Sequence, residues 1–290
     1  MSLEFRRHKE LTSVQIAQLE QAMVGFYQHP PPSYYQTANL AAQHYNRTEM
    51  PFHCDLLDRV YPGTTVLELG CGTAHLCAQV EARGGKYTGL DHSERLLEEN
   101  RRCHPQARFF PIGTPLSPTF DIVASLYTIE HIVDPPAYLE TLWKACRPGG
   151  LVAVICPEFV ECPDLPPSVF FGRTARRLSE KIRAFDFADA LQHWLDLKVR
   201  GWRWKRLAQQ HPPGAFWINL RPRVLHGANY TIDADAVHLV QLRDLIWFFE
   251  SKGAAVLQTS HMIPGVSAEV LKYNCYLLMQ KPLAVSKFGQ

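Results

Sequence analysis

A glycine-containing turn flanked by two acids is the segment of this sequence best suited to bind a ligand. Residues 66–74 read VLELGCGTA, and Asp91 follows Glu68 by 23 positions. The apolar run predicts a buried strand, after which Gly70 and Gly72 allow the backbone to turn tightly against a ligand. Asp91 ends a second apolar stretch, where a carboxylate at a strand tip can accept hydrogen bonds from two ribose hydroxyls. The pattern predicts a nucleoside-binding βαβ unit.

The residues around the turn indicate which nucleoside fits. A dinucleotide-binding G-x-G-x-x-G/A turn needs a small residue at position 75, where this sequence has His75. Glu68, two residues before Gly70, would repel a pyrophosphate and attract an amino group. The pattern E-x-G-x-G-x-A resembles motif I of the class I S-adenosylmethionine-dependent methyltransferases, [D/E]-x-G-x-G-x-G, with Ala74 in place of the last glycine. Taken alone, the motif also fits a tight turn that binds nothing.

Further segments resemble the same family in the order that its fold requires. Residues 120–125 read as its fourth strand, and 127–135 (YTIEHIVDP) are close to its LEHVxDP segment. A helical pattern with apolar residues between 139 and 146 stops at RPGG (147–150), because proline and glycine do not continue a helix. A strand over 151–155 follows. The third strand, 107–114, is the weakest match, since the family commonly has an acid at the position of Thr114. A threonine hydroxyl can still accept a hydrogen bond from adenine.

The resemblance implies an α/β fold: a Rossmann-like, doubly wound, seven-stranded sheet whose last strand is antiparallel. It would carry a helical N-terminal lid and a cap inserted after the fifth strand. The expected organisation is a lid (1–59), a cofactor-binding core (60–157), a basic cap (158–236), a closing helix with the last two strands (237–282) and a tail (283–290). Within the closing part, the helix is predicted over 237–253 and the strands over 255–263 and 270–280.

The resemblance also implies a cofactor, S-adenosyl-L-methionine, and a set of residues around it. The residues expected to bind the cofactor are Tyr45, Glu68, Gly70, Cys71, Gly72, Asp91, His92, Thr114, Leu126 and Tyr127. His131, about six residues after the fourth strand, is the first candidate for a general base, and His226 is the second. The alternative role of His131 is to order its loop, and that of Tyr45 is to pack the lead-in helix. The alternative for His226 is a position in a surface loop. No metal site is expected.

The predicted cap carries most of the positive charge of the chain. Between Arg173 and Arg223 there are 12 Lys and Arg against 4 Asp and Glu, although the net charge of the whole chain is only +2. Four of the six tryptophans lie there too. The segment could be a solvated helical face over a small second core. It could instead receive an anionic or aromatic molecule, or contact an anionic membrane through 173–206. Nucleic acid is the least favoured partner, because no RNA-binding module is recognisable.

Composition supports an ordinary globular chain. At 290 residues and 46% hydrophobic, the sequence can bury a large α/β core. No apolar run reaches the ~18–20 residues that span a bilayer, and the N-terminus lacks a signal-peptide pattern. The eight cysteines contain no C-x-x-C pair. We therefore expect a cytoplasmic chain with reduced thiols.

The function predicted from these features is methyl transfer from S-adenosylmethionine to an O, N or C atom of a small organic acceptor. Anionic, aromatic and lipid-like acceptors all remain open, as does the oligomeric state. An alcohol, phenol or ammonium acceptor must lose a proton, and histidine is the usual base; a carboxylate or thiolate only needs positioning. The alternative is a non-catalytic module that binds the same cofactor and acts as a partner or regulator.

Overall fold

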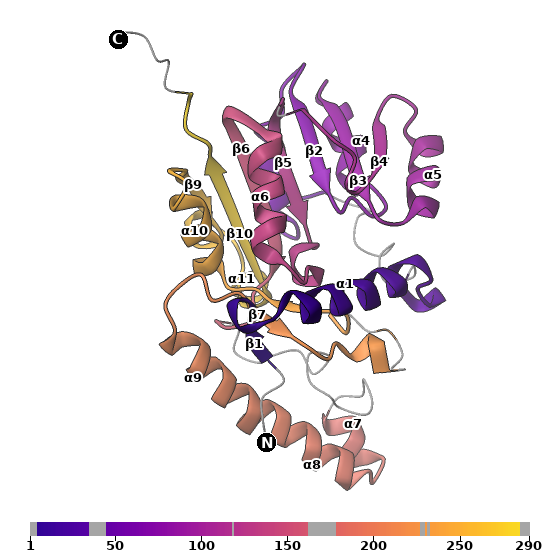
Figure 1. Ribbon diagram of the computed structural model, residues 1–290, viewed down its shortest axis with the longest axis vertical. Coiled ribbons are helices and arrows are strands. Elements are labelled where there is room, and N and C mark those ends of the chain that lie inside the picture. Colours follow the sequence, from indigo (N-terminus) through magenta and orange to yellow (C-terminus); the bar gives the residue numbers. More distant parts are fainter. Residues whose placement is uncertain are drawn as a thin grey trace. The chain divides into compact units, whose positions relative to one another are not determined.

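The computed structural model describes residues 5–34, 45–117, 119–161, 178–226, 230 and 233–284. The chain divides into two compact units, whose helices and strands are labelled in Figure 1. The core unit comprises Ala42–Ile129, Pro136–Pro157 and Leu242–Gln290, and the accessory unit comprises Met1–Ala41, Glu130–Pro135 and Glu158–Gln241. The His226 side chain and the cap residues 162–177 lie outside the described residues.

The core unit is built on a seven-stranded sheet of order β4-β3-β2-β5-β6-β10-β9. Neighbouring strands from β4 to β6 are parallel, and β10 runs antiparallel to both β6 and β9. This arrangement confirms the predicted Rossmann-like sheet with an antiparallel last strand. The strands are β2 (Thr65–Leu69), β3 (Lys86–Asp91), β4 (Arg108–Pro111), β5 (Phe120–Leu126), β6 (Cys146–Pro157), β9 (Ala255–Thr259) and β10 (Asn274–Gln280).

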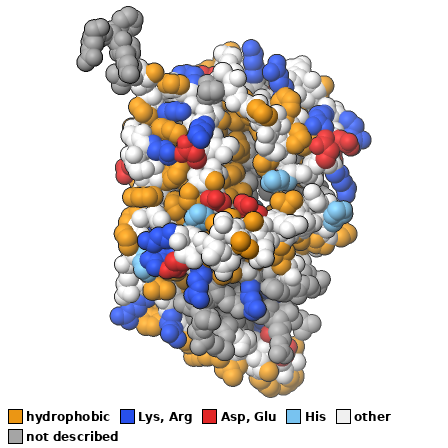
Figure 2. Space-filling view, viewed as in Figure 1, with side chains coloured by type: hydrophobic (Ala, Val, Ile, Leu, Met, Phe, Trp, Pro, Cys, Tyr) orange, Lys and Arg blue, Asp and Glu red, His pale blue; other side chains and the backbone are white. Residues whose placement is uncertain are grey.

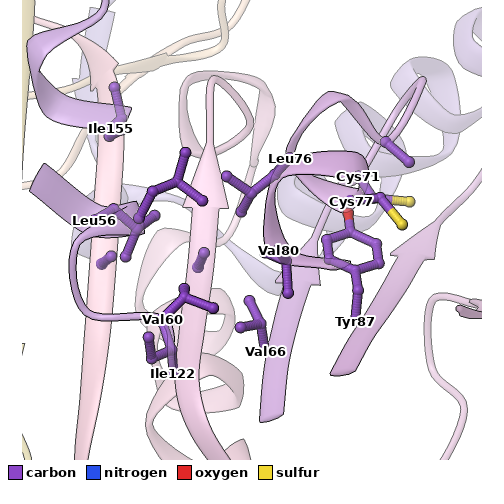
Figure 3. Close-up of a cluster of buried hydrophobic side chains, with 14 of the residues drawn as sticks. Leu56, Val60, Val66, Cys71, Leu76, Cys77, Val80, Tyr87, Ile122 and Ile155 are labelled. Atoms are coloured by element: carbon purple, nitrogen blue, oxygen red, sulfur yellow. The ribbon is translucent and has the colours of Figure 1, made fainter. Parts of the chain in front are cut away.

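Helices bury the apolar faces of this sheet. Leu76 and Val80, one helical turn apart on α4, lie in the same buried cluster as Val66 of β2 and Ile122 of β5. Figure 3 shows Val80 beside Val66, so helix and strand interlock at this point. The helices of the unit are α3 (Pro51–Leu57), α4 (His75–Glu81), α5 (Glu94–Cys103), α6 (Pro135–Ala145), α10 (Leu242–Glu250) and α11 (Ala268–Tyr273).

Parallel pairing brings the predicted binding residues to one edge of the sheet. Leu69 pairs with Leu90 in parallel register, and the neighbouring strand β5 ends at Leu126. Because parallel strands end at the same edge, the turn after Leu69, the Asp91 carboxylate and the residues after Leu126 all lie at the carboxyl edge. Open α/β sheets bind ligands at this edge.

Several predicted element boundaries in the closing part were wrong. The closing helix begins at Leu242 instead of 237, because His238 and Leu239 form a strand that pairs with 217–218. Strand β9 ends at Thr259, where a 3-10 helix follows. Residues 270–273 belong to helix α11, whose N-cap Ser267 accepts a hydrogen bond from the Val270 amide. A strand pairing with distant residues shortened the closing helix, and a capped helix displaced the start of the last strand.

The accessory unit contains a second sheet that the sequence did not reveal. Its three antiparallel strands are β1 (Phe5–Arg7), β7 (Trp217–Asn219) and β8 (His238–Leu239), in the order β1-β7-β8. Helix α1 (Ser13–Gln28) follows the N-cap residue Thr12, which forms a capping box with Gln15. Leu19 and Met23, four residues apart on α1, share a buried cluster with Val133, Ile218 and Val237. Residues from the predicted lid, core, cap and closing part therefore share one small core.

The tryptophans of the basic segment have two different environments. Trp204 and Trp217 are buried, and the rings of Trp204 and Phe5 meet edge to face. Trp194 and Trp202 are exposed, as are several apolar side chains of the preceding helices, which appear at the lower end of the view in Figure 2. The helices here are α7 (Leu178–Arg183), α8 (Phe187–Leu195), a π-helical turn (Asp196–Gly201) and α9 (Trp202–Gln210). Within the described residues, no helix is sufficiently long and apolar to cross a membrane.

Candidate functional site

The glycine turn after β2 has a backbone that requires glycine. Gly70 has φ +75°, and a Cβ built on it would lie 2.5 Å from Oγ1 of Thr128 and closer still to its Cγ2. The Thr128 hydroxyl donates to the carbonyl oxygens of Gly70 (3.2 Å) and Leu126 (3.1 Å). Thr128 therefore links the glycine turn to the end of β5, and it can do so only because residue 70 has no side chain.

Asp91 fixes the same turn from β3. One of its carboxylate oxygens accepts from the Gly72 amide at 2.8 Å, and the other accepts from the Ser93 amide at 2.8 Å. The Asn100 side chain donates to the Gly72 carbonyl, also at 2.8 Å. Each carboxylate oxygen keeps a further lone pair, so Asp91 can hold the turn and still accept from ligand hydroxyls.

Gly72 provides the open face of the turn. Its φ is +50°, and no atom of the described residues lies within 4 Å of a Cβ built on it. A turn closed on one side by Thr128 and open on the other is the shape expected of a cradle for a ligand. Ala74 and Tyr127 also have positive φ (52° and 51°) without being glycine. Such strain in non-glycine residues is typical of functional sites.

Glu68 is a buried acid beneath this cradle. Its side chain accepts a hydrogen bond from the Tyr87 hydroxyl, and the residue is only 4% exposed. Burial raises the pKa of Glu68 to about 8, with a smaller contribution from the Asp91 charge, while the Tyr87 bond opposes the shift. At neutral pH the carboxyl group is therefore largely protonated, and a nearby ligand cation would favour its ionised form.

Three aromatic side chains gather at the same edge of the core unit. The Tyr45 and His53 rings meet edge to face at 5.7 Å, and the His53 and Tyr127 rings stack at 5.9 Å. The nearby Glu68 carboxyl contributes to raising the pKa of Tyr45, after burial as the main cause. Burial lowers the pKa of His53 to about 4, so its imidazole is neutral. The sequence pattern had not singled out His53, because it is one histidine in a short helix without a motif.

The remaining predicted cofactor residues lie on this edge with differing exposure. Cys71 is buried, and a Cβ on Gly89 would lie 2.7 Å from its sulfur, so Cys71 serves packing. His92 and Tyr127 are exposed, whereas Leu126 is half-buried. The Thr114 hydroxyl donates to the Pro111 carbonyl at 2.7 Å, which leaves its oxygen lone pairs available to an adenine amino group. Its contact with adenine stays a prediction.

His131 belongs to a polar cluster of the accessory unit. Its Nδ1 lies 3.4 Å from a carboxylate oxygen of Asp235, which also accepts a 2.8 Å bond from the Tyr27 hydroxyl. Its Nε2 lies 3.7 Å from Glu130. The Glu130 backbone is fixed by the Val237 amide, which donates to its carbonyl at 2.8 Å. Asp235 and Tyr27 are distant from His131 in sequence, so no local spacing could have identified them.

The charges in this cluster influence one another strongly. Burial raises the pKa of Glu130 to about 8 and that of Asp233 to about 6. For His131, burial opposes protonation, but Asp235, Glu130 and Asp233 together raise its pKa above the ordinary value. The imidazole is therefore held as a cation at a higher pH than a free histidine, and it loses its proton as the pH rises through this elevated pKa.

The core unit also contains one group of side chains with metal-ligating chemistry among the described residues. Ligand atoms of Cys77, Glu81 and His104 all lie within 4.8 Å of one another. Glu81 and His104 form an ion pair at 3.7 Å when the histidine is protonated. Burial raises the pKa of the Cys77 thiol to about 12, which favours its protonated form. An ion pair beside a buried thiol accounts for this arrangement without a metal.

Comparison with known proteins identifies similar sequences. A family model described as "Methyltransferase domain" matches residues 42–259. The ubiquinone biosynthesis O-methyltransferase of Idiomarina loihiensis is 32% identical over 99 residues, which is 31% of this chain and 41% of that protein. The trans-aconitate 2-methyltransferase of Deinococcus radiodurans is 36% identical over 100 residues, which is 33% of this chain and 39% of that protein. The chain thus spans about two fifths of the length of these relatives.

A solved structure extends the similarity of the fold across most of the chain. The Burkholderia thailandensis 1,6-didemethyltoxoflavin-N1-methyltransferase, solved with 1,6-didemethyltoxoflavin and S-adenosylhomocysteine, superposes with a TM-score of 0.53. The alignment covers 94% of this chain and 91% of that one at 12% identity. At this identity the match supports the fold alone.

Proposed function

Because the chain belongs to the methyltransferase-domain family, we propose that it transfers a methyl group from S-adenosylmethionine to a small organic acceptor. The observation that carries this proposal is the glycine cradle between two acids. Asp91 holds the cradle while keeping lone pairs for ribose hydroxyls, and the buried Glu68 lies beneath it. The names of the curated relatives, which include an O-methyltransferase and a trans-aconitate methyltransferase, support the reaction class.

The residues of the core unit fit this cofactor chemically. Asp91 would accept from the ribose hydroxyls, and Glu68 would ionise toward the positive charge of the ligand. The rings of Tyr45 and Tyr127 would cover the ligand, and cations are attracted to such ring faces. The open space above Gly72 leaves room for the ligand to lie against the backbone. When bound, S-adenosylmethionine supplies a methyl group on a positively charged sulfur, ready for attack by an acceptor atom.

We assign His131 the role of proton acceptor for acceptors that must lose a proton. Asp235 lies against its Nδ1, which favours a tautomer with the proton on that nitrogen and leaves Nε2 as the basic atom. His131 follows Tyr127 by four residues, and four residues of extended chain span at most about 14 Å. His226 remains a candidate on sequence grounds alone.

The cofactor assignment is tested by calorimetry with S-adenosylhomocysteine and, separately, with NAD. We expect saturable binding of the first and none of the second. Asp91→Ala should weaken binding by about 1–3 kcal/mol, the range for loss of hydrogen bonds at a buried polar group. Glu98→Ala, on the exposed side of the neighbouring helix α5, is the control and should bind normally. Unchanged affinity in Asp91→Ala, or comparable binding of NAD, would refute the assignment.

Turnover distinguishes an enzyme from a non-catalytic binding module. Formation of S-adenosylhomocysteine should rise when acceptors are supplied, and mass spectrometry should detect the methylated product. His131→Ala should lower the rate by about 10²–10⁴-fold if a proton must leave the acceptor. Saturable cofactor binding with no turnover across alcohols, phenols, amines, carboxylic acids and thiols would favour the binding module.

A further inference from the structure

Helix α8 of the accessory unit has its polar and apolar sides reversed. Its large apolar side chains lie on one face at spacings of four and three residues, and Phe187, Leu191 and Trp194 are 60%, 58% and 46% exposed. Asp189 lies on the opposite side of the helix and is only 4% exposed. A surface helix of a soluble domain ordinarily turns its apolar stripe toward the core and its charges toward water. The outward face of α8 therefore has the composition of a surface that meets an apolar environment.

Helix α7 shows the same reversal. Lys181 is 1% exposed, whereas its neighbour Ile182 is 49% exposed. The Nζ atom of Lys181 lies 3.1 Å from a carboxylate oxygen of Asp189, so a buried ion pair joins α7 to α8. Phe185, between the two helices, is 79% exposed, and its ring meets that of Phe187 at 6.0 Å. A buried ion pair is often no more stabilising than apolar side chains of similar volume, so stability alone does not explain why the charges lie inside and the apolar groups outside.

The exposed apolar side chains continue beyond α8 along the same helical backbone. Leu195 and Trp202, which flank the π-helical turn, both have α-helical φ and ψ, so α8, the turn and α9 follow one another without a break (Figure 1). Val199 follows Trp194 by five residues, the repeat of a π-helix, and Trp202 follows Val199 by three. Val199 and Trp202 are 39% and 57% exposed. The π-helical turn thus keeps these side chains in line with those of α8.

Basic side chains accompany the far end of this apolar line. Between Lys198 and Arg206 there are five Lys and Arg and no Asp or Glu. Arg203 and Arg206 are exposed, and the Arg206 guanidinium lies 5.5 Å from the centre of the Trp202 ring. Helices that lie in the plane of a membrane surface combine Trp, Phe and Leu with Lys and Arg in this way. Anionic lipid headgroups would complement the positive charge, and the boundary of the acyl chains would receive the apolar side chains.

We propose that the outward face of α7, α8 and α9 lies on the surface of an anionic lipid bilayer, with the apolar side chains between headgroups and acyl chains. This inference goes beyond the proposed function and does not depend on it. A second copy of the chain is the competing occupant. In a symmetric dimer the surface would meet itself, and residues 178–210 contain seven Lys and Arg against four Asp and Glu. Self-association would therefore bring like net charges together, whereas an anionic bilayer neutralises them.

Cosedimentation of the full chain with vesicles tests the charge. We expect saturable binding to phosphatidylcholine vesicles that contain phosphatidylglycerol, weakening as salt screens the charges, and little binding to phosphatidylcholine alone. Arg203→Gln combined with Arg206→Gln should weaken binding by about fivefold for each charge removed, which corresponds to ~1 kcal/mol per arginine. Arg102→Gln combined with Arg108→Gln removes two exposed charges of the core unit and is the matched control. This control should bind like the unmodified protein.

A second pair of variants tests the apolar face. Phe187→Ser combined with Leu191→Ser should weaken binding by at least about tenfold, or ~1.4 kcal/mol, because two side chains that enter the bilayer are lost. Val14→Ser combined with Tyr61→Ser replaces apolar side chains that are 61% and 64% exposed elsewhere on the chain. This control should retain binding. Circular dichroism verifies that every variant is folded.

The outcomes decide between a bilayer and the alternatives. Failure to bind phosphatidylglycerol vesicles, or equal binding to phosphatidylcholine alone, refutes the inference. Losses in the variants that are no larger than in their controls refute it as well. If sedimentation velocity without lipid shows a dimer that Phe187→Ser and Leu191→Ser dissociate, a second copy covers this face and the inference is wrong. S-adenosylhomocysteine binding is measured separately, so its failure in the unmodified protein would refute the proposed function and leave the membrane contact standing.

Discussion

The two glycines of the turn should respond to alanine in different ways. Gly70 and Gly72 both have positive φ, but among the described residues a side chain, that of Thr128, closes in Gly70 and none closes in Gly72. Gly70→Ala should therefore reduce stability strongly. Gly72→Ala should reduce it modestly and act mainly on ligand affinity, because its new methyl group would enter the open space of the cradle.

The expected magnitudes follow from the surroundings of each glycine. A non-glycine residue in the left-handed region costs about 1–2 kcal/mol, and this cost applies to both variants. At Gly70 the new Cβ would lie 2.5 Å from Thr128 Oγ1 and 2.9 Å from its Cβ, so Thr128 must move. Such overpacking adds about 1–3 kcal/mol. Displacement also removes the hydrogen bonds from Thr128 to Gly70 and Leu126. We expect a loss of about 2–5 kcal/mol for Gly70→Ala and about 1–2 kcal/mol for Gly72→Ala.

The assay is chemical denaturation monitored by circular dichroism, combined with calorimetry of S-adenosylhomocysteine. Thr128→Ala introduced together with Gly70→Ala removes the clashing atoms and should recover part of the lost stability. The double-mutant cycle then gives a favourable coupling energy between positions 70 and 128. Equal destabilisation by the two alanines, or additivity of the Gly70 and Thr128 substitutions, would contradict the close approach from which the prediction derives.

Three other predictions concern charge and surface. Burial raises the folded-state pKa of Glu68 to about 8. The stability that the protonated Glu68 contributes is therefore complete below the unfolded pKa near ~4.5 and is lost as the pH rises through 8. Glu68→Gln should flatten this decline of the free energy of unfolding in denaturation curves recorded between pH ~4.5 and 8. Asp235 raises the pKa of His131, so Asp235→Asn should move the ascending limb of the turnover profile to lower pH, and an unmoved limb would exclude this pairing. Trp202 is 57% exposed beside Arg206; if residues 173–206 contact anionic membranes, Trp202→Ser should reduce cosedimentation with phosphatidylglycerol vesicles, and equal recovery on phosphatidylcholine would argue against an electrostatic contact.

The core unit could be predicted because its signals are local in sequence. The strand, the glycine turn and the acid at the next strand tip occur within about 25 residues, and their geometry is dictated by backbone sterics and parallel pairing. Ala74 occupies the position of the last glycine of the family motif. Its φ of 52° is a conformation that glycine adopts readily. The motif therefore records a backbone requirement that this chain meets with a strained alanine.

The accessory unit could not be predicted because its contacts are distant in sequence. Strand β1 pairs with β7, so Phe5 lies opposite Asn219, and no periodicity within either segment announces that pairing. Tyr27 and Asp235 are joined by a hydrogen bond across 208 positions. His53 was missed for a different reason: its place in the aromatic group depends on burial and on ring contacts with Tyr45 and Tyr127, which a lone histidine in a sequence does not reveal.

The segment EHIVDP (130–135) could be recognised from the sequence, but the contacts of its side chains could not. The sequence identified it as a family motif following the fourth strand of the core, yet the chain changes unit between Ile129 and Glu130. Ile129 is buried in the core unit, while Glu130 and His131 join acids and tyrosines of the accessory unit. The predictable strand β5 ends at Leu126, four residues before Glu130 in the sequence. The partners that tune Glu130 and His131, Asp235 and the tyrosines, come from segments outside the motif. The residues proposed to bind the cofactor belong to segments whose signals are local in sequence, so the sequence could predict the methyl donor. The groups around His131 come from segments distant in sequence, so only the structure reveals them.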